Sequence, residues 1–255
     1  MIIDERVRAD LAGSTRFADI RLLDVTDSTN RVVADLAAEG VPEGVVVVAD
    51  LQTAGRGRLD RTWEAEPGSA LLVSVLLRPA GLPIPRWHLL TAAAGLAARD
   101  ACDAVSGHRP DLKWPNDLVS ANGKLAGILA ESTSGAAVVG MGLNVHSGPP
   151  GSVWLDELAG RRVSRSDLLV AWLRAFDGLL DDWDLVASRY RSECSTVGML
   201  VEVEQVGGRV TGTAESIDGE GRLVVRREPE GSEPVVVSAG DVVHLRPGLG
   251  GSSTR

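Results

Sequence analysis

The chain has 255 residues, of which 44% are hydrophobic and 24% charged, and its formal net charge is −9 at pH 7. A chain of this length can bury the core of one large domain and still carry a small second one. The acidic balance argues against a broad contact with nucleic acid, because phosphates require a basic surface. No apolar run reaches the roughly 20 residues that a membrane span needs.

The cysteine content and the first residues also narrow the class of protein. Cys102 and Cys194 lie far apart and have no partner at a metal-ligand spacing, so we expect neither a disulfide framework nor a zinc site. The N-terminal residues lack the basic-then-apolar layout of a secretory signal. We therefore expect a cytoplasmic protein.

The first predicted elements are a short helix, a strand and a second helix. Residues 1–19 can hold at most one short helix. Residues 20–25 are predicted to form a strand, and Asp27 or Ser28 is suited to cap a helix that follows it. Gly40 is expected to end this helix.

Two apolar segments, 45–51 and 70–77, predict strands on either side of a polar loop. A long amphipathic helix follows, with Pro85 in its first turn and apolar residues at helical spacing as far as Ala101. These elements form the predicted scaffold.

The second half contains two strands, two helices and then a run of short strands. Strands are predicted at 125–130 and 136–143, and helices at about 165–181 and 183–194. From Val197 onward, short alternating segments are separated by glycine-containing turns, which predicts a small β-barrel.

The loop after the second strand carries the sequence Gly55-Arg56-Gly57-Arg58. Glycine lets backbone N–H groups approach an anion closely, and arginine offers paired donors to carboxylate or phosphate oxygens. A solvated basic loop is the alternative interpretation. After this motif the chain continues with Leu59-Asp60-Arg61.

A second cluster reads Lys113-Trp114-Pro115-Asn116-Asp117, and Gly123-Lys124-Leu125-Ala126-Gly127 follows it. Pro115 fixes the turn after Lys113, so we expect its ammonium group to be held as a candidate catalytic charge. Further along, Gly140 and Gly142 predict either a close ligand approach or a simple strand irregularity.

Together with Asp27-Ser28-Thr29-Asn30, these two clusters resemble the biotin protein ligase family in order, spacing and residue identity, over about residues 20–246. The resemblance implies an α+β fold with a class II synthetase-like catalytic domain, residues 1–195, in which helices flank a mixed β-sheet. It also implies a small SH3-like β-barrel, residues 196–247, before a flexible tail, residues 248–255. Many relatives carry a further glycine where this chain has Leu59-Asp60-Arg61.

The resemblance implies an ATP-dependent, AMP-forming ligase. Such an enzyme activates biotin to biotinyl-5′-AMP and passes biotin to a lysine of a biotin carboxyl carrier domain of a carboxylase. Mg²⁺ is expected with the ATP, although no carboxylate cluster is visible that would cage it. We expect no nucleic-acid or membrane partner, and a monomer or weak homodimer.

Two alternatives remain. A lipoate or octanoate protein ligase belongs to the same superfamily. A biotin-responsive DNA-binding repressor is disfavoured by the net charge and by residues 1–19, which are too few for the helix-turn-helix that some relatives carry, so we expect the monofunctional type.

The resemblance also implies roles for single residues, with catalysis assigned to Lys113 and Arg58. The expected biotin-binding residues are Ser28, Thr29, Asn30, Gln52, Gly55, Arg56, Gly57, Arg58, Lys113, Leu118, Gly140 and Leu143. The expected ATP-binding residues are Arg56, Arg58, Lys113, Asn116, Lys124, Asn144 and Trp154. No metal ligand is expected among the side chains, and none of the four histidines has a spacing typical of catalysis.

Two segments are expected to move. The loop from Gln52 to Arg61, called the arginine loop below, is rich in glycine, and its arginine side chains repel one another. We therefore predict that it is mobile until an adenylate neutralises its charge. Residues 147–155 are rich in glycine and proline and end in an apolar segment, which predicts a lid that places Trp154 over the adenine. The alternative is that Trp154 is a fixed core residue.

Overall fold

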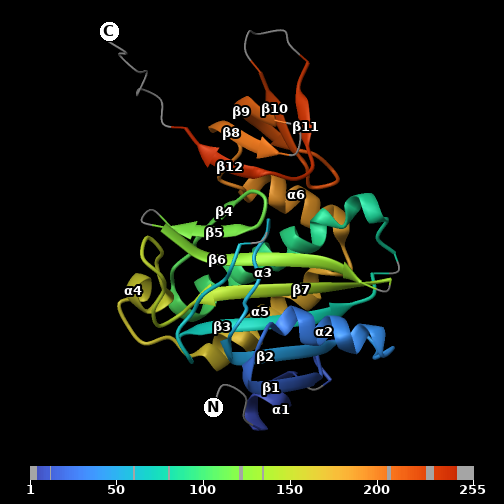
Figure 1. Ribbon diagram of the computed structural model, residues 1–255, viewed down its shortest axis with the longest axis vertical. Coiled ribbons are helices and arrows are strands. Elements are labelled where there is room, and N and C mark those ends of the chain that lie inside the picture. Colours follow the sequence, from blue (N-terminus) through green and yellow to red (C-terminus); the bar gives the residue numbers. More distant parts are fainter. Residues whose placement is uncertain are drawn as a thin grey trace.

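A computed structural model of the chain describes residues 5–11, 13–59, 61–79, 81–120, 123–133, 135–205, 208–227 and 233–245. The expected flexible tail, residues 248–255, lies outside the described residues. Figure 1 shows a large α/β layer structure with a small β domain at one end.

The large part is built on a seven-stranded mixed sheet of strand order β1-β2-β3-β7-β6-β5-β4. Its strands are β1 (Asp19–Thr26), β2 (Val45–Gln52), β3 (Ala70–Leu77), β4 (Asp111–Lys113), β5 (Asp117–Ser120), β6 (Gly123–Thr133) and β7 (Ala136–Asn144). Only β1 and β2 pair in parallel, while the other neighbours run antiparallel. The mixed sheet predicted above is therefore confirmed.

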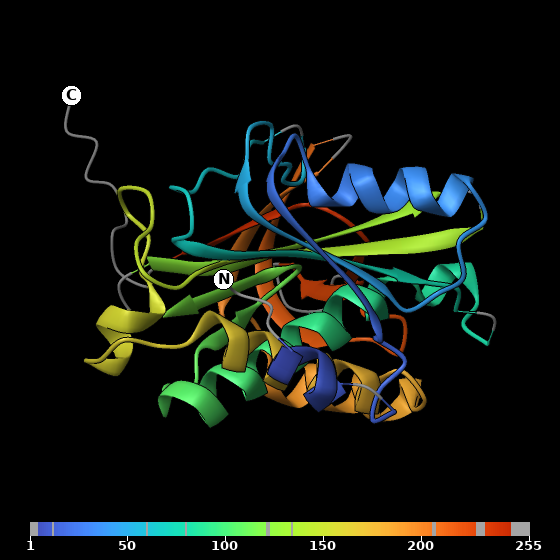
Figure 2. The ribbon, with the colours of Figure 1, turned by 90° about the horizontal axis from the view of Figure 1, so that it is seen from below.

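Helices cover both faces of this sheet (Figure 2). α2 (Thr29–Ala38) lies on one face, against β2, β3 and β7. The other face is covered by a larger layer. Its members are α1 (Glu5–Leu11), α3 (His88–Ser106), α5 (Arg165–Leu179) and α6 (Trp183–Glu193).

The core lies between the sheet and the larger helical layer. Trp172 and Phe176 of α5 are fully buried and stack with ring centroids 5.3 Å apart. The indole of Trp172 donates a hydrogen bond of 3.1 Å to the carbonyl of Ala94 in α3, so its one polar atom is satisfied inside the core. α3 packs one face into this core, which accounts for the apolar residues that recur at helical spacing in its sequence.

Two details differ from the predicted elements. Pro85 lies in a separate 3-10 turn, Ile84–Arg86, and α3 begins only at His88, with Trp87 as the capping residue between the two. A short helix α4 (Leu155–Ala159), too short to show a periodic pattern, stands before α5.

The small domain is an antiparallel sheet of strand order β11-β10-β9-β8-β12. Its strands are β8 (Leu200–Gln205), β9 (Gly208–Ile217), β10 (Leu223–Arg226), β11 (Val235–Val237) and β12 (Asp241–His244). Alternate residues such as Val201 and Val203 are fully buried, as expected for a sheet with one face in a core. The predicted α+β class and the second β domain are confirmed.

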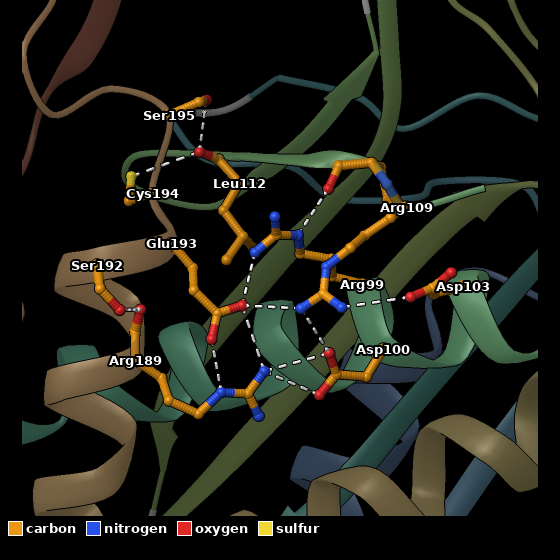
Figure 3. Close-up of polar contacts among 11 residues, drawn as sticks. Arg99, Asp100, Asp103, Arg109, Leu112, Arg189, Ser192, Glu193, Cys194 and Ser195 are labelled. Atoms are coloured by element: carbon orange, nitrogen blue, oxygen red, sulfur yellow. Dashed lines mark hydrogen bonds and ion pairs between the residues drawn. The ribbon is translucent and has the colours of Figure 1, made fainter. Parts of the chain in front are cut away.

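A network of ion pairs holds α6 against α3 where the chain turns toward the small domain (Figure 3). Glu193 lies 2.6 Å from Arg99 and 2.7 Å from Arg189, and Arg189 lies 3.0 Å from Asp100. Burial raises the pKa of Glu193, but Arg189, Arg109 and Arg99 outweigh this effect and bring the pKa below its ordinary value.

The two domains also share direct hydrogen bonds. The backbone N–H of Trp114 donates to Thr196 Oγ1 at 3.0 Å, and its indole donates to the carbonyl of Gly221 at 3.0 Å. Arg191 of α6 donates to the carbonyl of Ile217 at 2.6 Å. These bonds position the small domain beside the segment that carries Lys113 and Asn116.

Candidate functional site

The candidate site is a cavity on the face of the sheet that carries α2. The loop between β2 and β3 crosses this face (Figure 2), and Arg56, Gly57, Arg58, Arg61, Thr62 and Trp63 of this loop line the cavity. Of the residues expected from the sequence, the cavity brings together Ser28, Thr29, Asn30, Gln52, Arg56, Gly57, Arg58, Asn116, Lys124 and Gly140.

One end of the cavity is formed by the start of α2. Ser28 is the N-cap residue, but its side chain makes no capping hydrogen bond, so the buried hydroxyl is available to the cavity. Gln52 Oε1 accepts hydrogen bonds from the backbone N–H of Thr29 at 2.7 Å and from its hydroxyl at 3.0 Å. This end therefore presents closely spaced neutral donors and acceptors.

β6 and β7 carry glycines where other side chains of the protein pack directly against the strand backbone. A Cβ on Gly140 would lie 2.0 Å from Asn30 Oδ1. Gly142 faces Gly127 in register, and a Cβ on Gly142 would lie 2.4 Å from the indole ring of Trp63. The ring of Trp63 therefore packs directly on a pair of glycines in the cavity wall.

The arginine loop has a defined backbone. Arg56 pairs with Thr62, and the backbone N–H of Trp63 donates to the carbonyl of Gly55 at 2.9 Å. A Cβ on Gly55 would lie 2.3 Å from the carbonyl oxygen of Trp63, so only glycine fits at this position. Leu59 adopts φ of 54°, a left-handed conformation that costs a non-glycine residue about 1 kcal/mol.

Arg58 is partly buried beside neutral partners. Its guanidinium donates to Asn116 Oδ1 at 3.1 Å and to the carbonyl of Gly240 at 3.3 Å, and no described carboxylate lies within ion-pair distance of it. Burial lowers the pKa of Arg58, with smaller opposing effects from Asp241 and Asp117. A partly desolvated cation without a counter-ion is suited to bind an anion.

Lys124 supplies a second cation. Its Nζ lies 2.7 Å from Asp117 Oδ1 and 5.6 Å from the centre of the Trp63 ring. The Lys124 ammonium and Asp117 Oδ1 are close enough for an ion pair, but their geometry does not make a hydrogen bond. The indole N–H of Trp63 is buried without a partner in the described part of the chain.

Lys113, expected to be the catalytic lysine, does not line the cavity. It ends β4, the outermost strand of the sheet, and pairs in register with Asp117. The pKa of His244 in the small domain is lowered first by the burial of its ring and second by the charge of Lys113. The edge position carries the ammonium group toward that domain, and the lysine of the cavity is Lys124.

Leu118 and Leu143, expected as cavity walls, are fully buried in the core instead. Each directly follows a residue that lines the cavity, Asp117 and Gly142 respectively. Because successive side chains of a strand point to opposite faces, both leucines face the helical layer.

Three other expected residues are not part of the cavity lining. Gly55 shapes the loop backbone, as described above. Asn144 is buried, and its amide N–H donates to the carbonyl of Val153 at 3.2 Å, while its Oδ1 has no partner among the described residues. Trp154 is half-buried and precedes α4.

The structure adds residues to those assigned to the site from the sequence. They are Arg61, Thr62, Trp63, Asp117, Gly127, Ile128, Leu129, Met141, Gly142 and Asp241. Asp117 and Gly127 belong to the second cluster and Trp63 closely follows the first motif, so their positions in the sequence could have indicated them. Asp241 forms an ion pair with Arg61 from far along the chain, and no sequence signal indicated it.

A second hollow, of about 450 Å³, is larger but has its charges satisfied. Arg16 there pairs with Asp177 and Asp181 at 2.6 and 2.9 Å, and Arg78 donates to backbone carbonyls. Within the described ranges no group of three or more His, Cys, Asp or Glu is placed to hold a metal ion. No described helix is long and apolar enough to cross a membrane.

Known families match both parts of the chain. Residues 22–147 match the biotin/lipoate A/B protein ligase family, and residues 198–245 match the biotin protein ligase C-terminal domain. A biotin–acetyl-CoA-carboxylase ligase of Mycobacterium tuberculosis is 40% identical, over 96% of this chain and 96% of that protein. The chain belongs to the biotin protein ligase family.

Other relatives agree with this membership. The bifunctional ligase/repressor BirA of Bacillus subtilis is 30% identical over 79% of this chain and 67% of its own length. A biotin protein ligase from Aquifex aeolicus, solved in complex with biotin and ATP, superposes with a TM-score of 0.79 at 25% identity, over 90% of this chain and all of that one. The family, fold and enzyme class predicted for this ligase from its sequence motifs are confirmed.

Proposed function

We propose that the cavity of this ligase binds biotin and ATP end to end, joins them as biotinyl-5′-AMP, and then transfers biotin to a lysine of a biotin carboxyl carrier domain. The observation that carries this proposal is Arg58, a partly buried cation whose hydrogen-bond partners are all neutral. An acyl phosphate placed beside it would supply the missing counter-ion.

Biotin fits the end formed by Ser28, Thr29 and Gln52. Its ureido ring carries two N–H donors and one carbonyl acceptor, which match the hydroxyl and amide groups found there. The cavity lining also includes the apolar residues Ile128, Leu129 and Met141, against which an aliphatic chain can lie.

The reaction brings two anions together, the biotin carboxylate and the α-phosphate of ATP. Preorganised cations are the main means of stabilising the charge that develops in such a transition state. We assign this role to Lys124 and Arg58, because both line the cavity. We therefore assign to Lys124 the role that the sequence analysis expected for Lys113.

ATP fits the other end, beside Trp63 and Asn144. Trp63 lines the cavity, and its buried indole N–H and the buried Oδ1 of Asn144 lack partners in the described structure, so we assign the purine and ribose to this end. The expected lid, residues 147–155, starts from this end. Its far part is tied down, since the backbone N–H of Val153 donates to the carbonyl of Lys124 at 3.1 Å.

Magnesium is expected to arrive with the phosphates of ATP. Asp117, the described carboxylate nearest to Lys124, is already paired with it, and no described cluster of three acidic or histidine side chains would cage the ion. Substrate oxygens and water would therefore supply most of its ligands.

The remaining assignments concern the context of the enzyme. We place the domain boundary between Ser195 and Thr196, where the chain leaves α6 for the small domain. The acceptor is a carrier domain of a biotin-dependent carboxylase in the cytoplasm. The enzyme acts as a monomer or weak homodimer, without nucleic acid.

One assay tests the proposal. The protein is incubated with ATP, Mg²⁺ and a carrier domain, together with biotin, lipoate or octanoate, and the acceptor is weighed by mass spectrometry. We expect a mass gain with biotin only, together with AMP release. Labelling by lipoate or octanoate instead of biotin would overturn the proposal, and a gel shift with promoter DNA would contradict the expected absence of a nucleic-acid partner.

A further inference from the structure

Glu131 lies just beyond the biotin end of the cavity. It is on β6 and shares a sheet face with Gly127 and Leu129, which line the cavity four and two residues earlier. Glu131 itself does not line the cavity, and its side chain is 29% exposed. A carboxylate at this place acts on the site only through other residues.

The two oxygens of Glu131 have different partners. Oε2 accepts a hydrogen bond of 2.7 Å from the side-chain amide of Asn30, and Oε1 lies 3.0 Å from the guanidinium of Arg56. Both partners line the cavity. The carboxylate therefore joins the start of α2 to the arginine loop.

The Asn30 side of this link is rigid. Asn30 is buried, and its Oδ1 accepts a hydrogen bond of 2.6 Å from Ser74. Ser74 is fully buried in β3, a strand that is otherwise aliphatic. Because Ser74 fixes one end of the amide, Nδ2 of Asn30 is directed at the Glu131 carboxylate and, at 3.3 Å, at the carbonyl of Leu129.

On the Arg56 side of the link, the backbone is held by the loop contacts described above, and the freedom lies in the side chain. The side chain of Arg56 is 55% exposed. Among the described residues, the carboxylate that forms an ion pair with Arg56 is that of Glu131. An arginine on such a loop has many rotamers, and a fixed carboxylate selects one of them.

We propose that Glu131 is a positioning residue that holds the guanidinium of Arg56 over the biotin end of the cavity. The carboxylate occupies one edge of the guanidinium, and the remaining N–H groups stay free for an oxygen atom of biotin. This inference rests on the proposed function, because it assumes that biotin is the substrate at this end.

The test is a double-mutant cycle on the KM for biotin in the adenylation reaction. Glu131→Gln keeps an acceptor for Asn30 but turns an amide N–H toward Arg56. We expect it to raise the KM for biotin about tenfold, the equivalent of one lost charge-assisted hydrogen bond, and to leave the KM for ATP unchanged. In an Arg56→Ala background, the same substitution is expected to have no further effect.

Glu215→Gln is the matched control. Glu215 pairs with Arg226 at 2.9 Å in the small domain and lies outside the lining of the cavity, so we expect no change in the KM for biotin. If Glu131→Gln does not fold, Glu131→Asp serves instead. It keeps the charge but shortens the reach, and it is expected to raise the KM for biotin in the same way.

The outcomes separate cleanly. A rise in the KM for biotin that persists without Arg56 would show that Glu131 only shapes the sheet, and would overturn the inference. A normal KM in both Glu131 variants would overturn it as well. If the unmodified protein did not adenylate biotin at all, the proposed function would be refuted instead. The same experiment includes this measurement, so the two failures can be told apart.

Discussion

Arg58 of the arginine loop donates a hydrogen bond of 3.3 Å to the carbonyl of Gly240 in the small domain. The loop therefore contacts both domains at the point where it closes the cavity. Arg61, three residues further on, pairs with Asp241, the residue after Gly240 and the first of β12. The small domain thus contributes to holding the cations of the site, although its own sequence shows no motif.

Arg58→Ala is expected to lose most ligase activity and to release biotinyl-5′-AMP faster. Removal of the cation leaves the acyl phosphate without its counter-ion, and a loss on the order of 100-fold is typical for such a group. The half-life of the intermediate on the enzyme, followed by gel filtration, measures the effect. An unchanged half-life would count against the role assigned to Arg58.

Lys124→Ala is expected to reduce adenylation by roughly 100-fold, while Lys113→Ala changes it by less than about threefold. Lys124 lines the cavity, whereas Lys113 ends the edge strand β4. Pyrophosphate exchange measures adenylation, and thermal melting shows whether each variant is folded. The reverse order of the two effects would return the catalytic role to Lys113.

Gly142→Ala is expected to raise the KM for ATP, because the added Cβ would meet the indole ring of Trp63 at 2.4 Å and displace it. Gly178→Ala is the control. Gly178 lies in α5 with no atom near its Cβ position, so this change should leave kinetics unaltered and stabilise the helix by about 1 kcal/mol. An ordinary KM for ATP in Gly142→Ala would show that Trp63 is not part of the nucleotide site.

Trp154→Ala tests the lid. We expect a higher KM for ATP with little change in the KM for biotin or in melting temperature, because Trp154 is only half-buried. Leu155→Ala is the contrasting variant, since Leu155 is fully buried and its truncation should cost about 2–5 kcal/mol of stability. A large loss of melting temperature in Trp154→Ala with unchanged ATP dependence would make Trp154 a core residue.

The stability of the protein is expected to fall as the pH drops below about 6.5. Burial, and then the charge of Lys113, lower the pKa of His244 below its ordinary value of 6.5, and the pKa values of His88 and His146 are also lowered. A histidine with a lowered folded-state pKa binds more protons when unfolded, so its stabilising contribution is complete above 6.5 and declines below it.

His244→Gln measures this effect at one site. Thr196 Oγ1 lies 3.1 Å from Nε2 of His244 and accepts a hydrogen bond from Trp114, so we expect the Thr196 hydroxyl to donate to the neutral ring. Glutamine can accept the same hydrogen without titrating. The loss of unfolding free energy between about pH 7.5 and 5.5 should be smaller in the variant, and an equal loss in urea unfolding would contradict the assignment.

The order of strands and helices could be predicted from the sequence, because hydrophobic periodicity and turn residues act over short distances. Segments such as 45–51 and 70–77 differ from β2 and β3 by at most one residue. The arginine loop and the start of α2 were also identified from local motifs, and the cavity contains both. These features depend on residues close together in the chain.

The tertiary structure decided which side chains reach the cavity. Two leucines predicted as walls face the core because strand register, set by distant partners, orients each face. Of the two candidate lysines, Lys124 lies on a central strand and Lys113 on the edge, an order that depends on how the sheet assembles. Likewise, Ser74, Glu131 and Asp241 are unremarkable in sequence, and only folding brings them beside Asn30 and the arginine loop.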